Sequence, residues 1–519
     1  MVFSSLSFIC FFLPLTALVY FALPYRGWRN GVLLASSLLF YAWGEPRLII
    51  SMLIATLVAY VGGLIMDGCG HDCAEAEENG VRSKQKDACD FGYRKKKTVF
   101  VITVILLTAN LFVFKYFNFA ADNFARILGL SADIMRIALP VGISFYTFQI
   151  LSYVIDLWRG EIAVQKNFAR LLLYVCLFPQ LIAGPIVRYS TVEQELTDRR
   201  ETVDDAYAGT MRFITGLGKK VLLANNLAKI SEMIYGGSSF GTSAYWLAAL
   251  AYALQIYFDF SGYSDMAIGM GRIFGFNFLE NFNRPYLSTS VSDFWRRWHI
   301  SLSSWFRDYI YIPLGGNRRG SARRILNILI VWTLTGMWHG AEWNFMWWGL
   351  YYGVLLIAEK ALTDFFRRAG GSKYTDTERA SGGTAASGHS TCSDSENKIS
   401  AVLCTVLRWL ITMIIVLVGW VIFNRGADGQ LQSTLSMMFS FTATDWGAAL
   451  RSNAELLYAL IWIPAGILTV IFERGKDENG SRRGAEDGLL PLLWHAIILL
   501  ICITYLLSAG YNPFIYFRF

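Results

Sequence analysis

The chain of 519 residues is 54% hydrophobic, 15% aromatic and 16% charged, with a mean hydropathy of +0.39. An ordinary soluble enzyme carries about 25% charged residues, so this composition excludes one and requires lipid as the solvent for much of the surface. The net charge of +7 is small and scattered among apolar segments, which argues against a nucleic-acid partner and leaves Lys and Arg to set membrane topology.

Apolar runs recur along the whole chain, at the length that a helix needs to cross a bilayer. We expect an all-α polytopic membrane protein with roughly 11–14 membrane helices and short re-entrant or interfacial helices. Residues 1–519 then form a single membrane domain. The predicted spans are 6–23, 30–43, 48–66, 98–118, 138–157, 170–187, 211–234, 244–260, 325–342, 345–362, 402–423, 453–472 and 489–508.

The first apolar run, residues 6–23, has no basic residues before it and is followed by Arg26 and Arg29. This pattern predicts an uncleaved first helix with its N-terminus outside. Counting the spans forward makes the charged segment 67–97 a cytoplasmic loop. Three further segments interrupt the pattern: an Arg- and Trp-rich interfacial or re-entrant segment at 284–324, a low-complexity loop at 364–400 and a charged loop at 473–488.

The eight cysteines indicate neither a disulfide framework nor a metal centre. Several lie inside apolar runs, where cysteine behaves as a small hydrophobe. The cluster Cys69, His71, Cys73 and Cys89 lacks the usual zinc-ligand spacing. We therefore expect no metal site and no bound cofactor.

Three of the five histidines, His299, His339 and His495, lie in or beside apolar sequence. His339 ends a run that begins after Arg324, and fifteen residues of helix rise about 22 Å, which takes it past the midplane of the bilayer core. Ionisable groups at such depth mark pathways or reaction sites, and imidazole suits proton transfer near neutral pH. The alternative is a buried histidine satisfied by a neighbouring helix. His495 stands without convergent polar groups, which favours a structural role.

Aromatic and apolar residues recur every three or four positions around His299, which predicts one amphipathic helix lying at the membrane interface. The recurring residues are Trp295, Trp298, Leu302, Trp305 and Tyr309. Arg296 and Arg297 lie off this face. They either anchor the helix to lipid phosphates or receive the phosphates or carboxylates of an acyl donor or acceptor.

Two carboxylates, Asp259 and Asp265, lie within or beside apolar sequence. Buried carboxylates need partners. One reading pairs them with a core arginine such as Arg284; the other has them position a substrate or a catalytic histidine.

Two sequence blocks resemble a known family. Residues 294–318 read FWRRWHISLSSWFRDYIYIPLGGNR, and residues 335–345 read TGMWHGAEWNF. They resemble the paired histidine signature of the membrane-bound O-acyltransferases, most closely the bacterial alginate O-acetyltransferase type. Shorter stretches extend the resemblance over most of the chain.

The resemblance implies a helical core with a transmembrane tunnel and catalytic roles for His339 and His299. The further residues that we expect to contact substrate are Arg296, Arg297, Trp298, Asp259, Asp265, Trp338 and Asn344. The donor would be acetyl-CoA or another acyl thioester entering from the cytoplasm. The expected partners are a surface polysaccharide acceptor, an extracytoplasmic acetyltransferase and membrane lipid.

The leading hypothesis is therefore transfer of an acyl group, most simply acetyl, across a bacterial inner or plasma membrane to an exopolysaccharide or cell-surface glycan. Transfer is direct or passes through a partner. Three alternatives stay open. They are D-alanyl-type transfer to teichoic acid, a proton-coupled transporter or flippase using His339 and Asp259, and an assembly scaffold.

Overall fold

The computed structural model describes residues 2–78, 82–129, 136–181, 184–237, 240–369, 398–426, 429–473, 488–508 and 514. Every regular element in these ranges is a helix, which confirms the predicted all-α fold. The predicted loops 364–400 and 473–488 lie largely outside the described residues. The side chains of His71, Cys73 and Cys89 also lie outside them.

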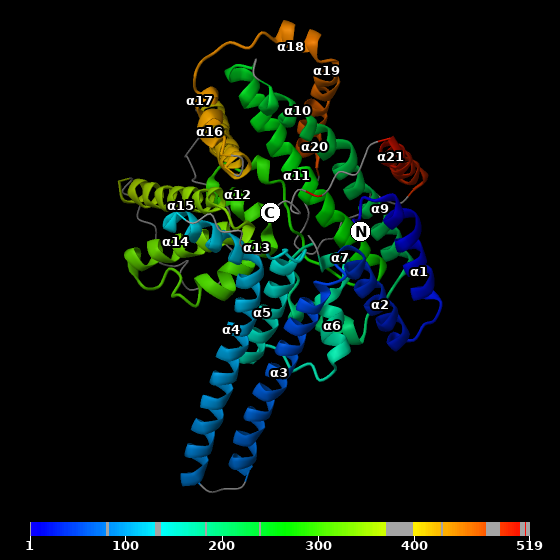
Figure 1. The fold of residues 1–519 in the computed structure, drawn as a ribbon, viewed down its shortest axis with the longest axis vertical. Coiled ribbons are helices and arrows are strands. Elements are labelled where there is room, and N and C mark those ends of the chain that lie inside the picture. The colour runs from blue at the N-terminus through cyan, green and yellow to red at the C-terminus, as the bar shows by residue number, and fades with distance from the viewer. Residues whose placement is uncertain are drawn as a thin grey trace.

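The N-terminal helices are α1 (Leu13–Phe21, after a π-helical turn at Phe8–Phe12), α2 (Arg26–Gly44), α3 (Ile49–Glu78) and α4 (Arg82–Leu128). Helices α3 and α4 form a long hairpin that projects from the body of the protein (Figure 1). The segment 67–97, expected as a loop, instead continues both helices on either side of a short gap. Its many Glu, Lys, Arg and Ala residues are strong helix formers, so charge alone does not end a helix there.

The next helices are α5 (Ile143–Arg159), α6 (Phe168–Cys176), α7 (Phe178–Leu181) and α8 (Tyr189–Thr197). The predicted single span over 170–187 is wrong. Helix α6 ends at Cys176, and Leu177 adopts φ −52° and ψ 110°. Pro179 follows two residues later and has no N–H group with which to continue the helix.

A central helical pair forms the most buried part of the molecule. Its members are α9 (Val203–Gly218), which continues through a π-helical segment η2 (Lys219–Ala224) into α10 (Asn225–Gly236), and the long α11 (Thr242–Ile273). Glycines face each other where α9 meets α11: a Cβ atom on Gly216 would lie 2.4 Å from the Gly262 carbonyl oxygen. The two backbones are therefore in close contact, as is typical of membrane helices that have small residues at their interface.

The segment that carries His299 is a chain of short helices: η3 (Pro285–Leu287), α12 (Val291–Arg297), α13 (Ile300–Phe306) and the π-helical η4 (Arg307–Tyr311). The prediction of one amphipathic helix is wrong, because the backbone breaks at His299, where φ is 45°. The indoles of Trp295, Trp298 and Trp305 are buried within the protein. The aromatic face thus packs against protein rather than against the membrane surface.

A helical hairpin, α14 (Gly320–His339) and α15 (Trp343–Ala369), covers this segment. The C-terminal helices are α16 (Lys398–Arg425), α17 (Leu431–Met438), α18 (Trp446–Ser452), α19 (Ala454–Leu460), α20 (Trp462–Phe472) and α21 (Leu489–Ser508). Helices α16 and α17 pack against α11, while α19 and α20 pack against α10, in the upper part of Figure 1.

Five helical stretches among the described residues are long and apolar enough to cross a membrane: Ile49–Cys69, Phe91–Leu128, Ser400–Arg425, Ala454–Phe472 and Leu489–Ser508. The protein is therefore a multi-pass membrane protein. Five is fewer than the 11–14 spans expected, partly because central helices such as α11 bury Asp259 and Asp265 and are less uniformly apolar. Such helices are shielded from lipid by the helices around them.

Candidate functional site

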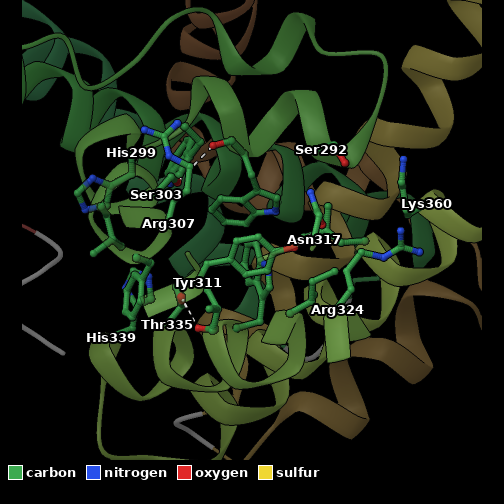
Figure 2. A pocket seen from close by; sticks show the side chains of 18 residues that line it. Ser292, His299, Ser303, Arg307, Tyr311, Asn317, Arg324, Thr335, His339 and Lys360 are labelled. Atoms are coloured by element: carbon green, nitrogen blue, oxygen red, sulfur yellow. Dashed lines mark hydrogen bonds between the residues drawn. The ribbon is translucent and has the colours of Figure 1, made fainter. Parts of the chain in front are cut away.

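A cavity of about 440 Å³ lies between the short helices α12 to η4 and the hairpin α14–α15. Both candidate histidines line it. Figure 2 shows His299 and His339 at one end of the cavity and Arg324 and Lys360 at the other. The remaining polar side chains along it are Ser292, Ser303, Arg307, Tyr311, Asn317 and Thr335.

His299 occupies the break between α12 and α13 with φ 45° and ψ 56°. A left-handed conformation at a residue other than glycine costs about 1–3 kcal/mol and persists only where the surroundings enforce it, often at functional sites. Its side chain is 2% exposed and meets the edge of Phe260 at 4.7 Å between ring centroids. The strained backbone aims a buried imidazole at the cavity.

Hydrogen bonds fix which nitrogen of His299 carries the proton. The amide oxygen Oδ1 of Asn281 lies 3.0 Å from His299 Nδ1 and accepts from the Ser301 backbone N–H and hydroxyl. A backbone N–H can only donate, so the Asn281 atom must be the oxygen, and His299 Nδ1 must be the donor. This leaves Nε2, which has no hydrogen-bond partner among the described residues, as the acceptor of the neutral ring.

His339 is the last residue of α14, which confirms the predicted helix. Its ring is buried and packs edge-on against Trp348 and Phe423, with centroid distances of 5.0 and 5.2 Å. One indole joins the two histidines, because the Trp338 ring lies 4.9 Å from His339 and 5.7 Å from His299. The two blocks that are separate in sequence therefore meet around Trp338.

Cations at the cavity outnumber the carboxylates that hold them. Arg324 and Lys360 share Asp364, at 3.5 and 3.4 Å. Arg307 shares Asp308 with Arg188, and both contacts measure 2.7 Å.

Burial alone would raise the pKa of the Asp308 carboxyl. The hydrogen bonds from Arg307 and Arg188 outweigh burial, so the pKa of Asp308 lies below its ordinary value. Asp308 is therefore anionic near neutral pH, and each carboxylate balances only one of two cations. The excess positive charge suits an anionic ligand.

The other predicted contact residues divide into two groups. Trp298 lines the cavity, and the Trp338 ring contacts both histidines. Arg296 is 69% exposed, Arg297 binds Asp293 at 3.0 Å, and neither lines the cavity. Asn344 also lies outside it and donates to the Phe423 carbonyl at 2.9 Å.

Asp259 and Asp265 belong to an ionic cluster in the helical core. Asp259 pairs with Lys220 at 2.5 Å, and Asp265 pairs with Arg212 and Lys219, both at 2.8 Å. Pairing with a core arginine is confirmed for Asp265, although the arginine is Arg212 of α9 and not the suggested Arg284. Asp259 pairs instead with a lysine of η2. Neither carboxylate lines the cavity.

Sequence reasoning missed Lys360 as a ligand-facing cation and treated Arg324 only as a marker of the membrane surface. The sequence did contain a signal for their proximity. In an antiparallel helical hairpin, residues that lie equally far from the connecting loop on its two sides lie close to each other. It also missed Asn281, whose contact with His299 depends on a loop that no periodicity predicts. No group of three or more metal-binding side chains occurs in the described part of the chain.

The chain is similar in sequence to several known proteins. A sequence model of the MBOAT, membrane-bound O-acyltransferase family, matches residues 7–381. A probable alginate O-acetylase AlgI of Azotobacter vinelandii is 37% identical over 88% of this chain and 81% of its own. One of Pseudomonas putida is 34% identical over the full length of both chains. A peptidoglycan O-acetyltransferase of Helicobacter pylori is 32% identical over 66% of this chain and 64% of its own.

Proposed function

Because this chain belongs to the membrane-bound O-acyltransferase family, and is thus a membrane acyltransferase, we propose that it moves an acetyl group from a cytoplasmic acyl thioester to an exopolysaccharide or another cell-surface glycan. Acetyl-CoA is the simplest donor. The names of the relatives support an acetyl group and a polymeric acceptor, since they act on alginate or peptidoglycan.

The observation that carries this proposal is one cavity with His299 and His339 at one end and the cations Arg324 and Lys360 at the other. A thioester donor such as acetyl-CoA has the matching polarity, with a neutral reactive acyl end and a phosphate-bearing end. Guanidinium and ammonium groups bind phosphate through charge-assisted hydrogen bonds. Arg324 and Lys360 would hold the phosphates while the thioester carbonyl lies beside the imidazoles.

In the proposed reaction, His339 takes the proton from the acceptor hydroxyl as the oxygen attacks the thioester carbonyl carbon. The new C–O bond forms, the C–S bond breaks, and the thiolate leaves and takes up the proton. His299 Nε2 is a second proton acceptor in the cavity and accepts a hydrogen bond from the departing thiol once it has taken up its proton. The same steps apply if the first acceptor is a nucleophile on an extracytoplasmic partner that then acetylates the glycan.

Charge reversal at the cationic end tests the binding mode. Arg324→Glu and Lys360→Glu should each raise the KM for the thioester by about tenfold or more, because a charge-assisted hydrogen bond is worth about 1.5–3 kcal/mol. The kcat should change little, since the imidazoles are untouched. Arg136→Glu is the matched control: its side chain is 72% exposed and lies outside the cavity lining. An unchanged KM in both cavity variants would refute the proposed donor site.

A further inference from the structure

Lys115 is a buried ammonium group to which the proposed reaction assigns no role. It lies in α4, inside one of the apolar stretches long enough to cross a membrane, yet its residue is 8% exposed. A buried charge in such a segment is costly and persists where it contributes to structure or function. The partners of Lys115 show which part of the molecule it serves.

The ammonium group of Lys115 donates to the main-chain carbonyl of Trp338, the residue directly before His339. It also donates to the Ser144 hydroxyl at 3.0 Å. Ser144 lies in the first turn of α5, so one side chain joins α4, α5 and the end of α14. The ammonium also lies 5.9 Å from the centre of the Trp338 ring.

The next residue of α4 repeats the contact. The Tyr116 hydroxyl donates to the main-chain carbonyl of Met337. The last carbonyl groups of a helix have no hydrogen-bond partner within that helix. A positive charge near them is favourable because it interacts with the negative end of the helix dipole. Lys115 and Tyr116 therefore cap two successive carbonyls in the turn that ends at His339.

We propose that Lys115 is a positioning residue, which holds the last turn of α14 so that the His339 imidazole stays directed into the cavity. This inference rests on the proposed acyl transfer. The chain changes direction directly after His339, where Gly340 is extended at φ −167°. Without the caps from α4, the final turn of α14 loses the contacts that fix its orientation, and a misplacement of about 1 Å in a reacting group can cost about a hundredfold in rate.

The test compares Lys115→Met, Lys115→Arg and His339→Ala, each purified, quantified as folded protein and assayed with a labelled acetyl thioester. Lys115→Met should lower kcat by about tenfold to a hundredfold with an unchanged donor KM, because binding at the cationic end does not depend on this turn. Lys115→Arg retains a cation and hydrogen-bond donors and should recover most of the lost kcat. Tyr116→Phe removes one cap and should have the smaller effect.

Lys96→Met is the matched control, since Lys96 lies on the same helix with its ammonium 5.6 Å from the Trp158 ring, outside the cavity lining. Its kcat should equal that of the unmodified protein. The inference is overturned if Lys115→Met keeps the original kcat per folded molecule, or if it raises KM and leaves kcat intact. A His339→Ala protein with full activity would instead refute the proposed chemistry, so the two failures are distinguishable.

Discussion

The environment of His299 shows how single residues prepare the cavity for proton transfer. The imidazole lines the cavity and is held by a left-handed backbone and by the Asn281 oxygen, which leaves Nε2 as its proton acceptor. A neutral, oriented ring is the form that accepts a proton. Asn281 does not line the cavity, and besides its contacts with Ser301 it orients the histidine that does.

Replacing Asn281 should therefore lower the rate without changing donor binding. In Asn281→Ala, His299 loses the acceptor that fixes its proton on Nδ1, and kcat should fall by at least about tenfold, part of the roughly 10²–10⁴-fold that a positioned acid or base supplies. Steady-state kinetics per folded molecule measures the change. Asn226→Ala removes a buried asparagine elsewhere, whose amide donates to the Leu222 carbonyl, and should leave kcat unchanged. Equal kcat values for the two variants would contradict this role.

At the scale of elements, the close packing of α9 against α11 sets the position of Phe260, a residue of α11 whose ring contacts His299. Two glycine pairs, Gly209 with Gly269 and Gly216 with Gly262, let the backbones meet. A Cβ atom at any of these positions would lie 2.4 to 2.7 Å from the facing carbonyl oxygen. The facing atoms belong to the backbone, which cannot move aside as a flexible side chain can. Only glycine therefore fits at these four positions without forcing the helices apart.

Alanine substitutions should consequently have opposite signs at two helical glycines. Gly216→Ala should destabilise the protein by about 1–3 kcal/mol, because overpacking forces α9 and α11 apart. Gly31→Ala should stabilise it by about 0.4–1 kcal/mol: Gly31 is exposed in α2 with no atom within 4 Å of an added Cβ, so only the entropy of the unfolded chain changes. Thermal unfolding of the purified protein in detergent measures both. The same sign at both sites would argue against the close contact.

At the scale of the whole molecule, buried ion pairs tie the C-terminal helices to the core behind the cavity. Lys219 contacts Asp265 at 2.8 Å and Glu473, at the end of α20, at 2.6 Å. Glu473 also accepts from the Tyr257 hydroxyl. Breaking a buried pair by removing one partner costs about 3–5 kcal/mol, so these contacts hold distant parts of the chain in one arrangement. Apolar faces of α16 and α21 remain exposed and suit contact with lipid.

The sequence predicted the parts of this arrangement that follow from local pattern. Apolar runs predicted helices, and the rarity of histidine in apolar sequence singled out His299 and His339. The sequence did not predict contacts between distant segments. For example, Lys220 lies in a π-helical segment, where its buried side chain pairs with Asp259. The sequence does show Lys115 as a lone cation in an apolar run, which is the pattern that indicates a functional or structural role. The aromatic period around Trp298 was misread because periodicity does not show a backbone break.

The most direct test of the proposed role of His339 is transfer of a labelled acetyl group from a thioester by the purified protein in liposomes, with the acceptor glycan or partner present. The unmodified protein should transfer the acetyl group. His339→Ala, when equally folded and binding the thioester equally well, should do so at a rate at least about a hundredfold lower. Transfer by His339→Ala at the unmodified rate would contradict the central claim, as would proton-coupled solute movement without acyl turnover.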